Sequence, residues 1–348
     1  MKKCLIIINR AAGGSKKVSF DKVEKCLGDM YDYTRCTLPD DPDPNPRGYD
    51  AVAICGGDGT LGSVLGKIYD KAIDVWYFPV GTLNDKAKAE RYEDSKTTCP
   101  SCGGGKTGKQ VIVGRCDDLP HNLPHNLPHK QGRLWGPQES PLQTEMSMGT
   151  PMQSPQESPS QTEMYVGTPD ENSRLFTYVL AAGAFTSIGY TAKVSVKKKL
   201  GVLAYLGQVL KEYKPHRIHA QIDCGSKCYE GDFNLIMFVK SPRCFGFKFN
   251  KAYDSESNSG HLVAIRSPKH DGLLGKIEMF FPFFRVFFIG MKSERDGKII
   301  FKKIYSATFT HSENTDYCRD GEKQTLSSGS HQIKFIRSLC NFNVIEKF

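Results

Sequence analysis

Short apolar runs that end at glycine-bearing turns characterise the first part of the chain. Residues 3–8, 51–55 and 75–80 are almost wholly apolar, and a turn containing glycine follows each run. Apolar positions such as Val18 and Val23 then recur at helical spacing. Because strands alternate with helices and each glycine turn follows a strand, the pattern predicts an open, mostly parallel sheet with a ligand crevice at the strand ends. A further strand is expected over residues 32–38.

The second half of the chain has a period-two pattern. Residues 217–223 and 230–239 alternate around Cys224-Gly225-Ser226-Lys227, which predicts a β-hairpin. Few helical patterns lie between the later runs, so we expect a chiefly antiparallel second domain. Its further strands are expected over residues 261–266, 299–309 and 332–339.

Tandem repeats separate these two regions. PHNL at residues 120–123 recurs at 124–127, and PQESPLQTEMSMGTP from Pro137 recurs as PQESPSQTEMYVGTP from Pro155. Segments so rich in proline, serine, glutamine and threonine cannot bury an apolar face. The repeats therefore predict a disordered insertion. The expected organisation is an α/β domain over 1–115, the insertion over 119–172, a β-rich domain over 175–325 and a C-terminal segment, 326–348, that could return to the first domain.

The net charge favours certain classes of binding partner but does not identify one. The chain has 348 residues and a formal net charge of +9, which favours phosphates, nucleic acids or anionic membranes. No nucleic-acid recognition motif interleaves the lysines and arginines, so we expect no nucleic-acid partner. No apolar run is long enough to span a membrane, and the first residues do not resemble a signal peptide. A cytoplasmic protein is predicted.

The pentapeptide Gly56-Gly57-Asp58-Gly59-Thr60 is the most informative motif. Glycines let backbone amides approach phosphate oxygens, and the following helix N-terminus favours an anion. Asp58 could orient a Mg²⁺-linked water there. The alternative is an ordinary strand-to-helix turn. A second turn of this kind, residues 79–85 (PVGTLND), follows the next strand and favours a phosphate site.

With NRAAGG at 9–14, LAAGAFTSIGY at 180–190 and RDGE at 319–322, these turns resemble the diacylglycerol kinase family of lipid kinases, which includes sphingosine and ceramide kinases. The resemblance follows the family's order along nearly all of the chain outside the insertion. It implies a Rossmann-like α/β domain, similar to NAD kinases and phosphofructokinases, followed by an antiparallel β-sandwich domain.

The family's residues carry over position by position where the motifs match. The resemblance implies ATP and Mg²⁺ as cofactors, Glu322 as the acceptor of the substrate's proton, and Asp58 as the second catalytic residue. It implies a Mg²⁺ network at Asp58 and Asp85, and a weak accessory metal site at Glu256, Ser259 and His261. The implied nucleotide-binding residues are Asn9, Arg10, Ala11, Ala12, Gly13, Gly56, Gly57, Asp58, Gly59, Thr60 and Thr82.

Several positions depart from the family pattern. Gly62-Ser63 stands where the family usually has Asn-Glu, and Lys86 where it has phenylalanine. Ile112 falls where the family has a carboxylate of the Mg²⁺ network, for which Asp117 or Asp118 is the alternative.

Taken together, the motifs predict a lipid kinase that phosphorylates diacylglycerol. A sphingoid base or ceramide kinase is the first alternative, and a weakly active or inactive nucleotide- or lipid-binding homologue is the second. The phenylalanine-rich run 280–288 is interpreted either as core or as a membrane-facing edge beside Lys197–Lys199. A lipid substrate, an anionic membrane surface and peripheral membrane association are expected, and a homodimer is left open.

Overall fold

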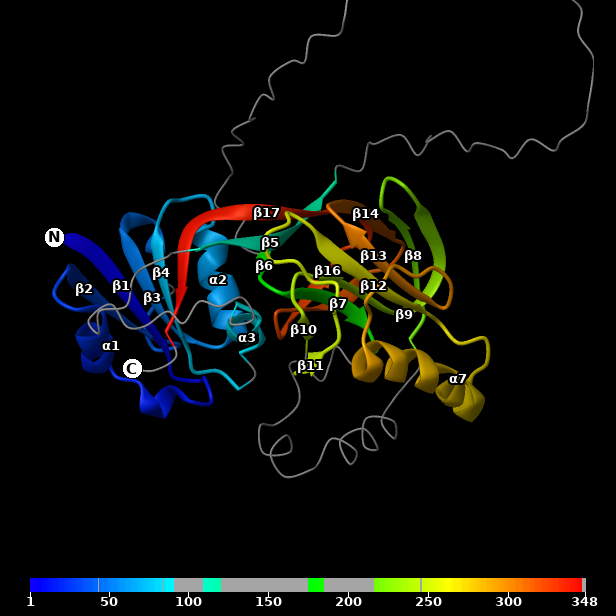
Figure 1. Ribbon diagram of the computed structural model, residues 1–348, viewed down its shortest axis with the longest axis horizontal. Helices are drawn as coiled ribbons and strands as arrows, with labels where there is room; N and C mark the ends of the chain where they lie inside the picture. Colours follow the sequence, from blue (N-terminus) through cyan, green and yellow to red (C-terminus); the bar gives the residue numbers. More distant parts are fainter. Residues whose placement is uncertain are drawn as a thin grey trace, which may run out of the picture. The chain divides into compact units, whose positions relative to one another are not determined.

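The computed structural model describes residues 1–42, 44–82, 84–90, 109–119, 175–184, 216–244 and 246–345 (Figure 1). Apart from Leu119, the predicted insertion 119–172 lies outside the described residues, as do Lys197–Lys199. Within the described residues, no helix combines the length and the hydropathy needed to cross a bilayer.

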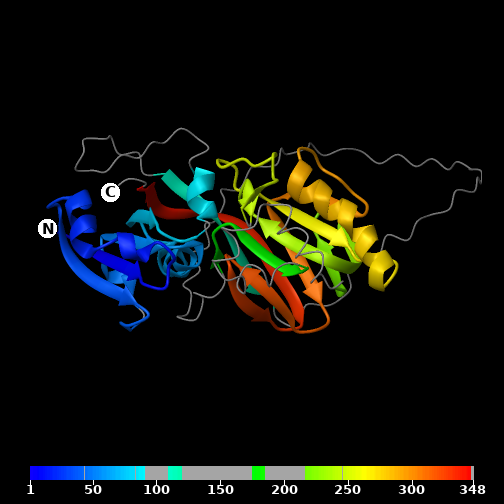
Figure 2. The same cartoon turned by 90° about the horizontal axis from the view of Figure 1, so that it is seen from below.

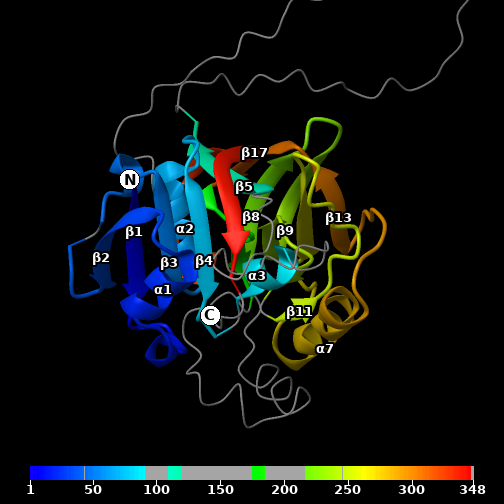
Figure 3. The same ribbon diagram turned by 60° about the vertical axis from the view of Figure 1, so that its left-hand side comes forward.

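A parallel sheet with a helix on each face forms the first lobe (Figure 3). Apolar side chains of α1 and α2 pack on opposite faces of the sheet. In spatial order, the strands are β4 (Asp74–Pro79), β3 (Ala51–Gly56), β1 (Lys2–Asn9) and β2 (Tyr31–Leu38). Strands β1, β3 and β4 are buried on both faces, which explains their nearly unbroken apolar runs, whereas the edge strand β2 is largely polar and partly exposed. The helices are α1 (Phe20–Leu27), α2 (Asp58–Ile68) and the short α3 (Asp85–Glu90).

The second lobe is largely antiparallel, as the period-two pattern predicts. The expected hairpin forms between β8 (Ile218–Asp223) and β9 (Cys228–Val239). The other strands are β5 (Lys109–Asp118), β6 (Leu175–Phe176), β7 (Val179–Gly183), β12 (Gly260–Arg266), β13 (Ile299–Ile304), β14 (Ser306–His311), β15 (Thr315–Arg319) and β16 (Glu322–Leu326). A two-stranded hairpin of β10 (Arg243–Cys244) and β11 (Phe247–Lys248) stands apart from this sheet.

The single strand predicted over 299–309 is wrong. The strand is interrupted at the exposed residue Tyr305, which separates β13 from β14. β13 pairs with β12, whereas β14 pairs with β8 and β17. The core-facing positions change from Ile300 and Ile304 in β13 to Ala307 and Phe309 in β14, so the alternation shifts by one residue at Tyr305.

The long strand β17 (Gly329–Val344) belongs to both lobes (Figures 1 and 2). Residues 329–334 pair antiparallel with β14, and residues 341–344 pair parallel with β4. The predicted strand 332–339 is therefore part of a longer one. Between these segments, the pairing of β17 with β5 shifts register between Arg337 and Asn341.

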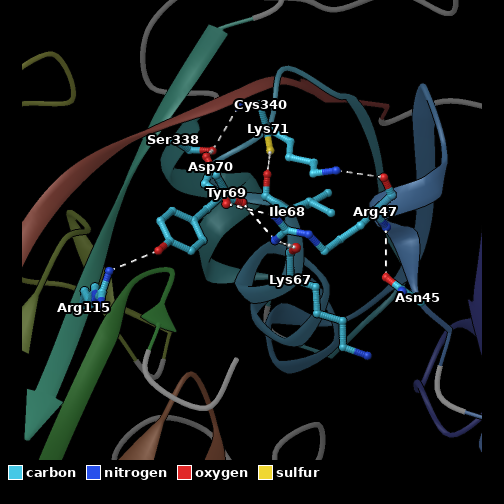
Figure 4. Close-up of polar contacts among 10 residues, drawn as sticks. All are labelled: Asn45, Arg47, Lys67, Ile68, Tyr69, Asp70, Lys71, Arg115, Ser338 and Cys340. Atoms are coloured by element: carbon cyan, nitrogen blue, oxygen red, sulfur yellow. Dashed lines mark hydrogen bonds and ion pairs between the residues drawn. The ribbon is translucent and has the colours of Figure 1, made fainter. Parts of the chain in front are cut away.

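At this register shift, residues of β17 form hydrogen bonds with the C-terminal end of α2 (Figure 4). Leu339 N donates to Tyr69 O at 2.7 Å, and Ser338 Oγ donates to the same carbonyl at 3.1 Å. Cys340 Sγ lies 3.0 Å from Ile68 O. Carbonyls at the end of a helix have no partner within the helix, so β17 supplies the donors that they lack.

Helix α7 (Gly272–Phe284) and the π-helical turn Arg285–Ile289 contain the phenylalanine-rich run. Met279, Phe283 and Val286 are buried against side chains of β7, β9 and β12. Phe281, in contrast, is 69% exposed. One face of the run is therefore core and the other is exposed to solvent, and its membrane-facing role stays a prediction.

Gly114 in β5 lies against the ring of Phe176 in β6, so a substitution at Gly114 tests how tightly these two strands pack. A Cβ at Gly114 would lie 2.0 Å from Cζ of Phe176, its cross-strand partner. We expect Gly114→Ala to lower the free energy of unfolding by about 2 kcal/mol, because the ring must move within a packed core. The control, Gly48→Ala, adds a methyl with no atom within 4 Å. Equal denaturation midpoints for the two variants would contradict this packing.

Candidate active site

Three turns of the first lobe meet at the carboxyl ends of β1, β3 and β4. Asn9 Nδ2 donates to Thr60 Oγ1 at 2.8 Å, which joins the first turn to the second. Gly14 N donates to Val80 O at 2.8 Å and joins the first turn to the third. Gly81 N donates to Gly56 O at 3.1 Å and closes the set. The sheet thus brings together the turns that the sequence singled out.

Glycine is required where these turns touch. A Cβ at Gly81 would lie 2.5 Å from the Cα of Gly57, and one at Gly56 would lie 2.6 Å from the Cβ of Thr60. A larger residue at Gly81 would push the second and third turns apart, and one at Gly56 would collide with Thr60 of its own turn. The outer parts of the turns, including Ala11, Gly13 and Thr82, remain exposed to solvent. Exposed backbone beside a helix N-terminus is a suitable surface for phosphates.

The implied nucleotide-binding residues accordingly gather at one edge of the sheet. The side chain of Arg10 folds back on its own turn, where its guanidinium donates to Val18 O at 3.1 Å. Gly13 lies close to Thr82: a Cβ at Gly13 would be 3.1 Å from Thr82 Oγ1. The binding roles of these residues stay predictions, although their placement is compatible with them.

Asp58 lies at the start of α2, and its carboxylate is buried. Oδ2 accepts the backbone N–H of Asp85 at 2.8 Å, and Oδ1 accepts that of Lys86 at 3.1 Å. Burial raises the pKa of Asp58 to about 7, while the two amide hydrogen bonds act in the opposite direction. Asp58 thereby fixes the N-terminus of α3 against that of α2.

Asp85 is fully buried and contacts the second lobe. Its Oδ2 accepts the N–H of Gly246 at 3.0 Å, and its Oδ1 lies 3.6 Å from Nε of Arg243. Both residues belong to the small β10–β11 hairpin. Sequence reasoning did not find Arg243 or Gly246, because their contact with Asp85 spans more than 150 positions.

A tight turn between β15 and β16 places Glu322. Asp320 and Gly321 have φ of 49° and 96°, the conformation that the Asp-Gly pair of a two-residue hairpin turn requires. The buried Asp320 carboxylate accepts the backbone N–H groups of residues 177, 178 and 179 and the hydroxyl of Thr177. Burial raises the pKa of Asp320, and these hydrogen bonds oppose that shift. Asp320 is an anchoring residue that sequence reasoning missed, although its Asp-Gly turn signal was visible.

Glu322 itself is exposed and lies over the first turn of α2. A Cβ at Gly59 would be 2.5 Å from Glu322 Oε1, so the carboxylate lies directly against this glycine. One turn further, a Cβ at Gly62 would be 2.9 Å from Asp320 Oδ2. The departure at Gly62 thus has a structural reason, because it accommodates the anchor of the Glu322 turn. Nothing in the structure explains Ser63, which is exposed.

Ile112 does not take part in this site. It is buried in β5 within the core of the second lobe. Asp117 accepts a hydrogen bond from Arg115 at 2.7 Å, and Asp118 pairs with His331 at 2.8 Å. Lys86, the other departure, is almost fully buried, and its backbone N–H donates to Asp58. Among the described residues, no group of three or more histidine, cysteine or acidic side chains is arranged to hold a metal ion.

The accessory positions lie elsewhere in the second lobe. His261 in β12 is buried, stacks on Phe301 at 4.9 Å and contacts Asn250 at 3.1 Å. Burial, followed by the charge of Lys240, lowers the pKa of His261 to about 4. Ser259 Oγ donates to Ser257 Oγ at 2.9 Å. Their role as metal ligands stays a prediction.

The raised pKa of Asp58 predicts a pH-dependent stability. Between the unfolded value of 3.8 and the folded value of about 7, the folded protein holds a proton that the unfolded chain has released. The free energy of unfolding should therefore fall as pH rises through this range, by at most about 1.4 kcal/mol per pH unit. Urea titrations across this range should show a steeper fall for the wild type than for Asp58→Asn. Parallel pH profiles would contradict the assignment.

Comparison with known proteins agrees with this geometry. Residues 3–113 match the family model of the diacylglycerol kinase catalytic domain. No curated protein matches the chain. The fold is similar to a diacylglycerol kinase from Bacillus anthracis str. Sterne, with 14% identity, a TM-score of 0.54 and coverage of 98% of this chain and 97% of that one. A candidate diacylglycerol kinase from the same organism has the same identity and coverage and a TM-score of 0.59. The resemblance inferred from the motifs is therefore supported: residues 3–113 match the model of the diacylglycerol kinase catalytic domain, and the fold that this chain shares with the Bacillus anthracis structure extends through the second lobe.

Proposed function

We propose that this protein is an ATP-dependent lipid kinase that transfers the γ-phosphoryl group of ATP to the hydroxyl of diacylglycerol. The observation that carries the proposal is the position of Glu322, an exposed carboxylate directly over Gly59 in the glycine turn of Asp58. A phosphate-binding turn and a carboxylate that can take a proton thus face the same space.

The reaction follows from these positions. The Glu322 carboxylate takes the proton of the lipid hydroxyl as its oxygen attacks the γ-phosphorus. The bond from that phosphorus to the bridging oxygen breaks, and ADP leaves with the electron pair. Backbone amides of the glycine turns and the N-terminus of α2 hold the phosphates. Asp320, which fixes the turn before Glu322, is a positioning residue.

Mg²⁺ fits the donor chemistry of this site. Asp58 and Asp85 supply carboxylate oxygens, the ligands that Mg²⁺ prefers, and they are the residues that would hold it, directly or through water. When bound, the ion would offset negative charge on the phosphates. Both carboxylates already accept backbone amides, so their orientation is set before any ion binds.

A weakly active, nucleotide-binding homologue is the second candidate. The observation that favours it is the core position of Ile112, which leaves the Mg²⁺ network with Asp58 and Asp85. Asp117 and Asp118 have partners of their own. This candidate predicts binding of ATP with little turnover.

Replacement of Glu322 tests the proposal. Glu322→Gln should lower kcat for diacylglycerol by about 10²–10⁴-fold, because the glutamine amide cannot take the proton. Binding of a fluorescent ATP analogue should stay unchanged. The matched control is Glu230→Gln, at an exposed glutamate of β9. Wild-type turnover by Glu322→Gln would contradict the assigned role.

Separate assays with diacylglycerol, sphingosine and ceramide and labelled ATP identify the acceptor. Phosphorylation of a sphingoid base or ceramide in preference to diacylglycerol would replace the proposed substrate by the first alternative. ATP binding with no phosphorylation of any of the three lipids would favour the second candidate.

A further inference from the structure

The outward face of α7 is unusually apolar for a surface helix. After two adjacent leucines at its start, its exposed positions follow one another at intervals of three or four residues, so they form one stripe along the helix. Leu273 is 73% exposed and Phe281 is 69% exposed. The stripe consists of Leu273, Leu274, Ile277, Phe281 and Phe284, and Ile289 extends it past the π-helical turn.

Aromatic stacking makes the far end of this stripe rigid. Phe284 stacks on Phe280 with ring centroids 5.9 Å apart and on Phe288 at 5.3 Å. Phe288 in turn contacts Phe247 at 5.2 Å. The stripe is therefore a fixed aromatic surface that does not have to order its side chains on binding, which lowers the entropic cost of association.

The charges beside the stripe are predominantly positive. Lys269, Lys276, Arg285 and Lys292 lie on or beside α7, and no carboxylate of the described chain pairs with their side chains. The carboxylates near the stripe each have a basic partner. Glu278 on the helix pairs with Lys298 at 2.6 Å, and Asp271, at the start of the helix, pairs with Arg217. Glu294 and Asp296, which line a cavity with Phe281 and Arg285, pair with Lys302 and Lys227. An apolar stripe with cationic borders is the composition of a helix that lies in the headgroup layer of an anionic membrane.

The β10–β11 hairpin connects this surface to the candidate active site. At one side, Phe247 contacts the rings of Phe287 and Phe288. At the other side, Gly246 N donates to Asp85 Oδ2 at 3.0 Å. Two adjacent residues thus contact the aromatic surface and a carboxylate of the site.

We propose that the outer face of α7 docks on an anionic phospholipid bilayer and presents the active site to diacylglycerol in that layer. This inference rests on the proposed function for its substrate, but the docking itself can be measured without turnover.

Vesicle sedimentation without ATP tests the docking. The probe is vesicles of equal parts phosphatidylcholine and phosphatidylserine. The double variant Ile277→Glu/Phe281→Glu should bind about tenfold less than the wild type, because charged side chains resist burial among acyl chains. Met30→Glu, at an exposed apolar position of the first lobe, should bind as the wild type does. Equal binding by the double variant, or no binding by the wild type, would overturn the proposal.

Turnover of a short-chain, water-soluble diacylglycerol separates docking from function. The double variant should phosphorylate it as the wild type does, since no membrane is involved. If the double variant loses vesicle binding but neither protein phosphorylates the lipid, the docking proposal is supported and the proposed kinase activity is contradicted. A change in oligomeric state of the double variant on size-exclusion chromatography would instead assign the stripe to a second copy of the chain and reject the bilayer.

A separate observation concerns the accessory metal loop. Lys240, at the end of β9, is 1% exposed, and its ammonium donates to the carbonyls of Asp254 and Ser257, both at 2.7 Å. The same ammonium lies 5.3 Å from the centre of the Tyr253 ring. A cation that belongs to the chain therefore already binds the carbonyl oxygens of this loop.

The loop does not fit a divalent ion in addition to this ammonium. Two positive charges would share one small set of oxygens, and their repulsion is strong at a buried site. His261 faces Asn250 and Phe301, and Ser259 is bonded to Ser257. We infer that Lys240 replaces the accessory metal ion and that this loop is independent of divalent cations.

Thermal unfolding without nucleotide tests the inference. Lys240→Met should lower Tm by about 5 °C, because two buried carbonyls lose a charged donor. The matched control is Lys303→Met, whose ammonium lies over the Tyr305 ring at 5.9 Å but is not buried, and it should change Tm little. An unchanged Tm for Lys240→Met would overturn the inference. So would a rise in wild-type Tm with MgCl₂ over EDTA that Glu256→Ala abolishes.

Discussion

The pairing of β17 with β4 is the contact on which the candidate site depends. One continuous strand belongs to the antiparallel sheet at its start and to the parallel sheet at its end. The phosphate turns follow strands of the first lobe, whereas Glu322 and the β10–β11 hairpin belong to the second. The shared strand fixes the separation of these groups through backbone pairing on both sides. The donors that β17 gives to the end of α2 hold the helix whose other end carries Asp58 (Figure 4).

Buried carboxylates that accept backbone amides hold the site together. Asp58 binds the start of α3, Asp85 binds Gly246 of the hairpin, and Asp320 binds the chain at residues 177–179. An amide is a weaker partner than a cation, so burial of Asp58 keeps its pKa high. Burial of these carboxylates therefore lowers the stability of the fold but fixes the position of their charge, as is common at functional sites.

The sequence predicts much of this arrangement, for identifiable reasons. Strands β1, β3 and β4 are largely apolar and are followed by turns that contain glycine, so the amino-acid pattern alone places these turns at one edge of the sheet. The Asp-Gly pair of 320–321 and the 217–239 hairpin carry local signals. The features that could not be predicted depend on residues far apart in the sequence. They are the interruption at Tyr305, the anchoring of Asp320, the contact of Arg243 with Asp85, and the burial of the Lys240 ammonium against the loop of Asp254 and Ser257. Nor could the phenylalanine run be assigned to one environment, since its helix has two faces.

The place of β17 in the chain has a consequence for folding in the cell. β4 at the edge of the parallel sheet is complete after Pro79, yet its partner, residues 341–344, is synthesised after every other strand described here. Until then, the growing chain has an apolar strand with unpaired backbone groups, a feature that invites association between chains. Completion of the first lobe is thus delayed until the strands of the second lobe have been synthesised.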